Sequence, residues 1–168
     1  MIRKHIHFIK MGGTIEFIDP AYDAINKNLM KLDTTIDSYL ESIVKPHFTF
    51  STESIVEKDS RDITDEDRTA LANAIMSSKH ETVIVTHGTF TMTDTALFLD
   101  NMKLDGKKVI LTGSMIPVIG FAASDAGFNL GFAIASFDNV DVGVYVSMNG
   151  GIFKANEVTK NTEDLRFE

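Results

Sequence analysis

The sequence predicts an α/β fold in which a doubly wound, mainly parallel sheet of the Rossmann-like or flavodoxin-like kind carries helices on both faces. Apolar segments alternate with helical patterns along the chain. Runs of β-branched residues such as 82–86 are typical of strands buried on both faces of a parallel sheet. Glycine turns follow several of these runs, and the repeated order of strand, turn and helix implies right-handed crossovers.

The first half of the chain is expected to begin with a strand over residues 6–9 that runs into the glycine turn at 12–13. A polar loop follows. Residues 36–44 have apolar side chains at helical spacing, and Pro46 just beyond them is a stop signal for this helix. A strand over 48–56 comes next.

The second half continues the alternation. Thr64 is the expected N-cap of a helix over 65–78, whose acidic first turn suits the helix dipole. The remaining expected elements are a strand at 82–86, a helix at 94–102 capped by Thr93, a strand at 109–112, a helix at 124–137 and a strand at 142–148 that closes the sheet.

Length and composition limit the kinds of protein that this chain can be. The 168 residues, 43% of them hydrophobic, can bury one sizeable core, so one domain spanning residues 1–168 is expected. The net charge of -8 argues against nucleic acid or an anionic membrane as a partner and favours a small molecule. The chain has no cysteine, signal peptide or apolar run of membrane-spanning length, which makes a cytoplasmic location the default. No cofactor or metal is expected, because the histidines show no ligand spacing beyond His5 and His7.

Two threonines follow glycine turns at expected strand ends. Thr14 comes after Gly12 and Gly13, and Thr89 comes after Gly88. A third glycine turn, at 113–115, follows the strand at 109–112. Ligands of doubly wound folds collect beyond the carboxyl ends of the strands, so we expect the three turns to converge on one crevice. A hydroxyl beside a glycine turn can act as a nucleophile on a carbonyl, although Thr14 can equally be an ordinary turn hydroxyl.

The motifs resemble those of the bacterial-type L-asparaginases. The segments in which the resemblance is found are Met11-Gly12-Gly13-Thr14-Ile15, His87-Gly88-Thr89-Phe90-Thr91, Lys107 to Met115, Asp59-Ser60-Arg61-Asp62 and Asp125 to Leu130. Their order and spacing agree with the family over nearly the whole chain. The family's second, C-terminal domain has no counterpart here, and the ending resembles that of short, one-domain asparaginases, so we expect the chain to be complete.

The resemblance implies an amidohydrolase that converts L-asparagine to L-aspartate and ammonia through an acyl-enzyme. It assigns Thr14 as the nucleophile, assisted by Tyr22 from the loop, although Tyr22 can also simply cover the edge of the core. It further assigns Thr89 and Lys107 as a second catalytic group, in which a buried lysine with a lowered pKa takes the threonine proton. Both side chains must then face the same cavity. His87 is expected to be structural rather than a base.

Substrate binding is assigned by the same resemblance to Gly13, Gly88, Ser60, Arg61 and Phe90. Ser60 can hydrogen-bond a substrate carboxylate or serve as a turn hydroxyl. Arg61 can bind a carboxylate in bidentate fashion, or it can pair on the surface with Asp62 or Asp65.

Phe90 is the main departure from the family, which has an aspartate there to hold the α-ammonium of the substrate. The loss of that contact costs about 1.5–3 kcal/mol, or roughly ten- to hundredfold in affinity, unless another acid replaces it. Asp19, Glu16, Asp125 or an acid of a neighbouring subunit can do so.

Three functions therefore stay open: a deamidase of free asparagine, a hydrolase of a different small or peptide-linked amide, and a binding or regulatory module with weak catalysis. The resemblance also implies a homodimer or homotetramer.

Overall fold

The computed structural model describes residues 4–17, 36–120 and 123–168. Its main sheet has six strands in the order β2-β1-β3-β4-β5-β6. The strands are β1 (His5–Gly12), β2 (Thr49–Lys58), β3 (Thr82–Thr86), β4 (Lys108–Thr112), β5 (Gly143–Met148) and β6 (Gly151–Lys154). The first five are parallel, which confirms the expected doubly wound α/β class.

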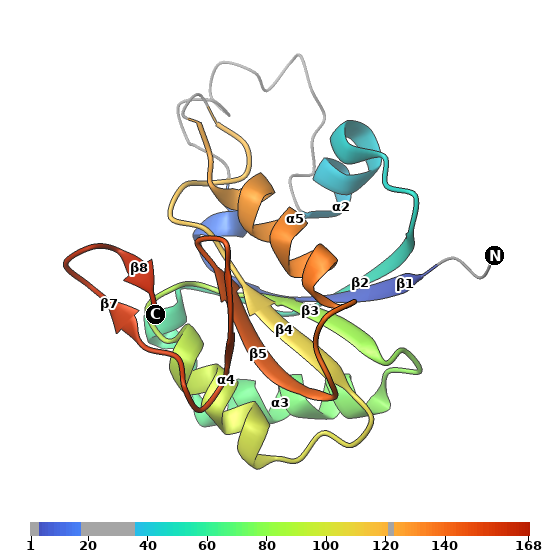
Figure 1. The fold of residues 1–168 in the computed structure, drawn as a ribbon, viewed down its shortest axis with the longest axis vertical. Helices are drawn as coiled ribbons and strands as arrows, with labels where there is room; N and C mark the ends of the chain where they lie inside the picture. Colours follow the sequence, from blue (N-terminus) through green and yellow to red (C-terminus); the bar gives the residue numbers. More distant parts are fainter. Residues whose placement is uncertain (1–3, 18–35, 121–122) are drawn as a thin grey trace.

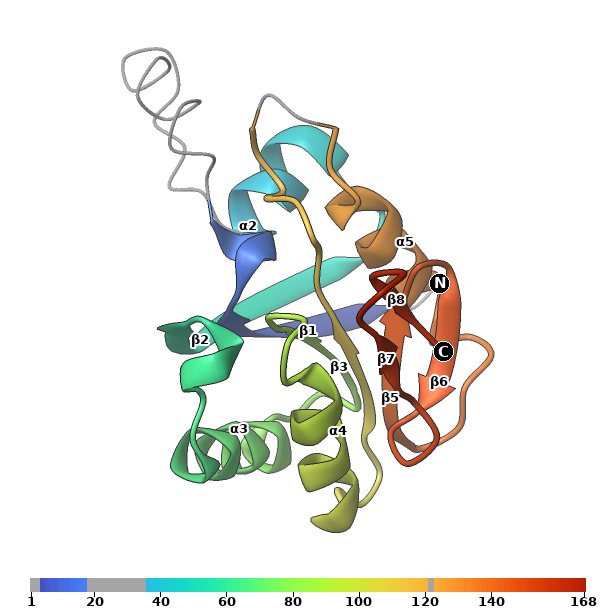
Figure 2. The ribbon, with the colours of Figure 1, turned by 90° about the vertical axis from the view of Figure 1, so that its left-hand side faces the viewer.

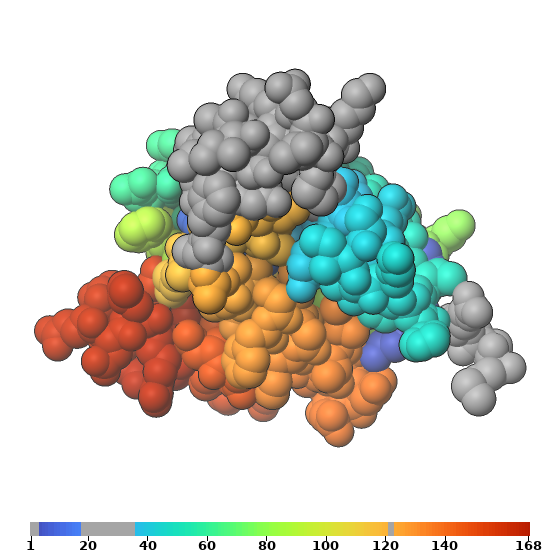
Figure 3. All heavy atoms as spheres, turned by 90° about the horizontal axis from the view of Figure 1, so that it is seen from above, coloured from blue at the N-terminus to red at the C-terminus, as the bar shows by residue number. Residues whose placement is uncertain are grey.

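Helices cover both faces of the sheet. Figures 1 and 2 show α3 (Asp65–Ser77) and α4 (Met92–Asn101) on one face, and α2 (Ile36–Ser38) and α5 (Ala126–Ser136) on the other. The α2 turn continues into the π-helical segment η2 (Tyr39–Val44), which lies beside α5 above the sheet (Figure 3).

The strands supply both cores because their side chains alternate between faces. Ile9, Val83, Val85, Val109 and Leu111 join the core with α3 and α4. Ile6, Phe8, Ile84 and Ile110 join the core with α2 and α5. The continuous β-branched runs of the sequence therefore correspond to central strands buried on both sides.

Thr64 caps α3 as expected. Its hydroxyl accepts a hydrogen bond from the backbone N–H of Asp67, and the carboxylate of Asp67 accepts one from the backbone N–H of Thr64. This reciprocal capping box satisfies two donors at the helix start.

Two expectations for the second half are wrong. Helix α4 begins at Met92 with Thr91 at the N-cap position, so Thr93 lies inside the helix and is not its cap. Strand β5 does not close the sheet, because the chain turns back through Asn149 and Gly150 and adds β6 in antiparallel orientation. Asn149 and Gly150 both have positive φ angles, 55° and 76°, which make this tight reversal possible.

The C-terminal residues form a small ribbon of two strands, β7 (Lys160–Asn161) and β8 (Arg166–Phe167). Phe167 is buried in the core of α3 and α4, and its backbone N–H donates to Asn149 Oδ1 at 3.1 Å. The ribbon is thereby attached to the turn between β5 and β6. Within the described ranges, no helix has the length and apolar character needed to cross a membrane.

Candidate active site

The three glycine turns meet at the carboxyl ends of β1, β3 and β4, as expected. A Cβ on Gly13 would lie 2.3 Å from the backbone nitrogen of Gly88, and one on Gly113 would lie 2.3 Å from the carbonyl oxygen of His87. Strands β1 and β3 are adjacent although β2 lies between them in sequence. The turns therefore sit at the topological switch point, where open α/β sheets bind ligands.

Thr14 begins the single-turn helix η1 (Thr14–Glu16), directly after Gly13. Gly13 has φ 82° and ψ 173°, a conformation that is essentially restricted to glycine. Thr14 is half-buried, so its side chain is partly accessible at this edge of the sheet. Tyr22, its expected helper, lies outside the described residues.

Thr89 has a lysine beside it, but this lysine is Lys160. Lys160 Nζ donates to Thr89 Oγ1 at 2.9 Å and to the Thr89 carbonyl oxygen at 3.1 Å. Thr89 itself is buried, and its hydroxyl also lies 3.5 Å from Met115 Sδ of the third turn. Partial burial lowers the pKa of Lys160, which shifts this group toward its neutral amine form.

The expected contact between Thr89 and Lys107 is wrong. Lys107 precedes β4 and lies at the amino end of this strand, whereas Thr89 follows the carboxyl end of the adjacent strand β3. The Lys107 ammonium donates to the backbone carbonyls of Ser78 and His80, at 2.5 and 2.9 Å. The two side chains therefore face opposite ends of the parallel sheet.

Sequence reasoning missed Lys160 because nothing local distinguishes it. The contact joins residues 71 positions apart, and Lys160 sits on a two-residue strand without periodic pattern. Phe167 pairs with Lys160 in the register of β7 and β8. Its side chain is buried, and this burial holds the ribbon against the rest of the fold.

Ser60 connects the loop after β2 to the Thr89 turn. It is 1% exposed, its hydroxyl accepts from the backbone N–H of Phe90 at 3.2 Å, and its carbonyl accepts from the Thr91 hydroxyl at 2.5 Å. A Cβ on Gly88 would lie 2.8 Å from Ser60 Cβ, so the two loops pack closely. Ser60 thus borders the site and holds the turn in place.

Arg61 pairs with Asp59 rather than with Asp62 or Asp65. Its Nε and one terminal nitrogen donate to the two carboxylate oxygens of Asp59, each at 2.9 Å. These hydrogen bonds, with a further one from the Arg61 backbone, lower the pKa of Asp59 to about 2. Asp65 instead pairs with Arg68. The Arg61 guanidinium is exposed, and its charge remains next to the site.

Phe90 lies between two cations. The Arg61 guanidinium carbon is 4.6 Å from the centre of its ring, and Lys160 Nζ is 4.7 Å from it. The ring is 61% exposed, so it borders the open side of the site. Cations attract the electron-rich face of an aromatic ring, which stabilises this arrangement without a carboxylate.

Two of the acids that could replace the missing aspartate at position 90, Asp125 and Glu16, form hydrogen bonds with other parts of the chain. Asp125 accepts hydrogen bonds from the backbone N–H groups of Met115 and Ile116 and from Asn129 Nδ2, at 3.0–3.1 Å. Glu16 accepts from the hydroxyl of Thr86. Asp19 lies outside the described residues.

His87 is structural, as expected. It is fully buried, with Nδ1 2.8 Å from the Gly88 carbonyl oxygen and Nε2 2.9 Å from Thr95 Oγ1. Burial lowers its pKa to about 4, so the ring is neutral at neutral pH. Both ring nitrogens are occupied, which leaves none for a substrate.

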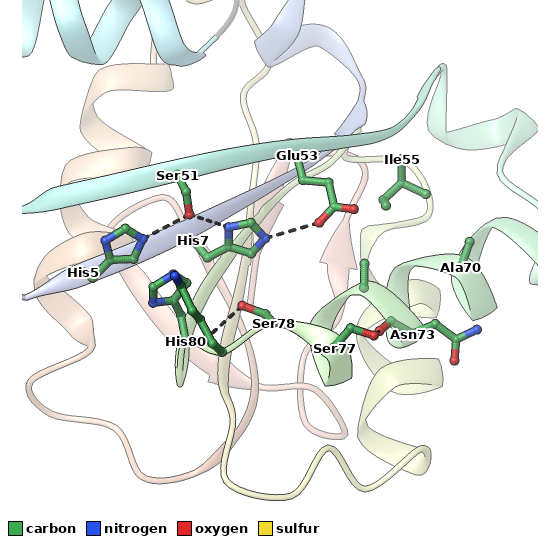
Figure 4. A pocket seen from close by; sticks show the side chains of 12 residues that line it. His5, His7, Ser51, Glu53, Ile55, Ala70, Asn73, Ser77, Ser78 and His80 are labelled. Carbon is green, nitrogen blue, oxygen red and sulfur yellow. Dashed lines mark hydrogen bonds and ion pairs between the residues drawn. The ribbon is translucent and has the colours of Figure 1, made fainter.

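A cavity of about 840 Å³ lies at the opposite end of β1 from Thr14 (Figure 4). Ser51 Oγ is 3.0 Å from His5 Nε2 and 2.8 Å from His7 Nδ1, and His80 stacks on His5 with ring centres 3.7 Å apart. In the part of the chain that the structure describes, no three His, Asp or Glu side chains are grouped to hold a metal ion. This cavity contains neither threonine turn.

Comparison with known proteins decides the family. The model of the family described as "Asparaginase, N-terminal" matches residues 5–166. The chain belongs to the asparaginase N-terminal family. A protein named "Probable L-asparaginase periplasmic" from Haemophilus influenzae is 34% identical over 94% of this chain and 46% of its own length.

Solved structures of this family share the fold. L-asparaginase I from Vibrio cholerae superposes with a TM-score of 0.80 and 28% identity over 99% of this chain and 51% of its own. A "Probable Cytoplasmic L-asparaginase" from Campylobacter jejuni gives a TM-score of 0.77 and 29% identity over 99% and 53%. The chain thus spans about half the length of these asparaginases.

The contact of Gly13 with Gly88 gives a stability prediction. Gly13→Ala is expected to lower the free energy of unfolding by about 2–4 kcal/mol, because it combines a strained conformation with a backbone collision. Gly106→Ala is the matched control, since Gly106 also has positive φ, 73°, but nothing within 4 Å of an added Cβ. The control is expected to lose only about 1 kcal/mol. Urea unfolding of both variants measures the difference, and equal losses contradict the close approach.

Proposed function

We propose that this chain is an amidohydrolase that deamidates L-asparagine to L-aspartate and ammonia. Membership of the asparaginase N-terminal family supports the reaction class. The observation that carries the proposal is the pair of threonines at one switch point, Thr14 directly after Gly13 and Thr89 with a lysine 2.9 Å from its Oγ1. A binding or regulatory module has no need of two hydroxyls and a lysine, so this third possibility is disfavoured.

In the proposed mechanism, Thr14 Oγ attacks the carbonyl carbon of the side-chain amide. The C–N bond then breaks, ammonia leaves with a proton, and water hydrolyses the resulting ester. Tyr22 is proposed to take the Thr14 proton. Lys160 replaces Lys107 in the second group: its lowered pKa increases the fraction of neutral amine, and this amine accepts the proton of Thr89.

A second substrate class is favoured by Phe90. The ring and the two cations beside it present no carboxylate for an α-ammonium group. An amide whose α-amino group is substituted, as in an asparagine peptide, carries no such cation and loses nothing at this position.

The assembly and the location of the chain are also proposals. A homodimer or homotetramer is proposed, in which a neighbouring subunit can supply an acid near Phe90. A cytoplasmic location is also proposed. The similar proteins carry both "periplasmic" and "Cytoplasmic" in their names, so they favour neither compartment.

Ammonia release tests the reaction. Purified protein is expected to release ammonia from asparagine or from short asparagine peptides, and Thr14→Ala and Thr89→Ala are each expected to reduce kcat by at least about a hundredfold. Glutamine and β-aspartyl amides complete the panel. Folded protein that releases no ammonia from any of these amides would refute the proposal.

Two matched variants, Lys160→Met and Lys107→Met, test which lysine acts on Thr89. Lys160→Met is expected to reduce kcat by about 10²–10⁴-fold, since it removes the proposed proton acceptor of Thr89. Lys107→Met is expected to leave kcat within a few-fold of the wild type, because its ammonium contacts only backbone carbonyls at the other end of β4. Steady-state kinetics of the two variants give the answer, and the reverse pattern would return the role to Lys107.

The role of Phe90 is tested by introducing a carboxylate. Phe90→Asp is expected to lower KM for free asparagine roughly ten- to hundredfold, the value of a charge-assisted contact to an ammonium group. Phe90→Leu removes the ring without adding charge and is expected to give no such gain. Unchanged or poorer kinetics with Phe90→Asp on a folded protein would argue against an ammonium subsite at this position.

A further inference from the structure

A buried polar cluster lies on the α2 face of the sheet, next to the turn of Thr14. It consists of Lys10 on β1, Thr86 on β3, Glu16 on η1 and Asp37 on α2. Lys10 and Thr86 are partners in the register of β1 and β3, so their side chains stand on the same face. The apolar side chains around them form the core of α2 and α5. No step of the proposed reaction uses these four residues.

The contacts within the cluster join two segments of the site. The hydroxyl of Thr86 donates to Glu16 Oε1. Glu16 is two residues beyond Thr14, and its backbone N–H donates to the carbonyl of Gly13 at 3.1 Å, which closes the η1 turn. Thr86 is the last residue of β3 and stands three residues before Thr89. The Glu16 carboxyl therefore bridges the turn of the first threonine to the strand that delivers the second.

The charges of the cluster are unbalanced. The Lys10 ammonium is 10% exposed and lies 3.2 Å from Asp37 Oδ2, so this pair is already neutral. Asp37 Oδ1 is buried and has no hydrogen-bond partner among the described residues. An ionised Glu16 adds a second negative charge, and Glu57 of β2 contributes a third nearby. Asp37 and Glu16 thus compete for one buried cation, Lys10.

Burial is the main cause that raises the pKa of Glu16 to about 7. The charges of Asp37 and Glu57 raise it further, while the hydrogen bond from Thr86 and the charge of Lys10 oppose the shift. Glu16 therefore changes its charge in the neutral pH range, unlike an ordinary glutamate.

We propose that Glu16 is a positioning residue whose ionised carboxylate ties the Thr14 turn to the Thr89 turn, so that its protonation loosens the site. The inference rests on the proposed amidohydrolase function. An ionised carboxylate accepts the Thr86 hydrogen bond with a full charge and attracts Lys10, and both interactions weaken when it takes up a proton. The activity is then regulated by pH through a group that touches no reacting atom.

Stability must change in the opposite direction to activity. The pKa of Glu16 in the folded chain lies above its ordinary value of 4.5. Between pH 4.5 and about 7 the unfolded chain has released this proton and the folded chain has kept it. The stability contributed by Glu16 is therefore full below pH 4.5 and is lost as the pH rises to about 7. This loss corresponds to a folding constant lower by about a hundredfold.

Glu16→Gln, Glu16→Ala and the exposed control Glu66→Gln test the proposal in the full chain. The pH profile of kcat/KM on the best substrate of the amide panel is expected to rise through a step near pH 7 in the wild type and in Glu66→Gln. Glu16→Gln is expected to lack this step and to stay at the low-pH level of the wild type, since a neutral amide accepts from Thr86 at any pH but never carries the charge that attracts Lys10. Glu16→Ala removes the bridge, and its kcat is expected to fall at least about tenfold at every pH. A step that persists in Glu16→Gln, or full activity in Glu16→Ala, overturns the proposal.

Two further measurements do not need activity. The ratio of the wild-type folding constant to that of Glu16→Gln, from urea unfolding, is expected to fall by about a hundredfold between pH 4.5 and pH 8. At equal pH above 7, amide hydrogen exchange at Gly88 and Thr89 is expected to be slower in the wild type than in Glu16→Gln, because only the wild type then carries the charged carboxylate. If both hold but no amide is hydrolysed, the proposed function fails and the positioning role stands. If amides are hydrolysed and Glu16→Gln changes neither measurement, only the role of Glu16 fails.

Discussion

The site depends on the contact between the backbones of Gly13 and Gly88. Nothing larger than hydrogen fits between them, because an added Cβ on Gly13 would lie 2.4 Å from the Gly88 Cα. This approach brings the residues that follow them, Thr14 and Thr89, to the same edge of the sheet. Ser60, in the loop after β2, also packs closely against Gly88. Three loops that start from β1, β2 and β3 are thus held as one unit by main-chain packing.

The ring of Phe90 lies between two basic side chains although the chain as a whole is acidic. The protein carries a net charge of -8, yet Arg61 and Lys160 flank the exposed ring of Phe90. Nearby acids have structural tasks, since Asp59 is bound by Arg61 and Asp125 by the backbone of the third turn. The contacts of the ring with these two side chains explain how an aromatic residue is accommodated where charge is expected.

The buried polar cluster beneath the site lowers the stability of the fold, and we propose that it positions the two threonine turns. Burial of Lys10 and Glu16 in the core of α2 and α5 is unfavourable unless each is paired, and the cluster holds one cation among several acids. Functional sites commonly retain such groups at the expense of stability. Here the Glu16 carboxyl lies on the connection between the two threonine turns, where we propose that its ionisation acts on their geometry.

The sequence by itself determined the class of fold, the central strands and the two threonine turns, because these follow from local patterns. β-branched runs, the Thr64 cap and the glycine turns act over a few residues, and the order of strands forces their carboxyl ends to one edge. Only the tertiary structure decided which lysine serves Thr89, which acid binds Arg61, and that Glu16 reaches Thr86. Lys107 was misplaced because it precedes β4 and so lies at the amino end of the parallel sheet, whereas Thr89 follows the carboxyl end of β3. The contact of Lys160 with Thr89 spans 71 residues, and its position is set by the burial of Phe167 on a short ribbon, a packing event that no local pattern encodes.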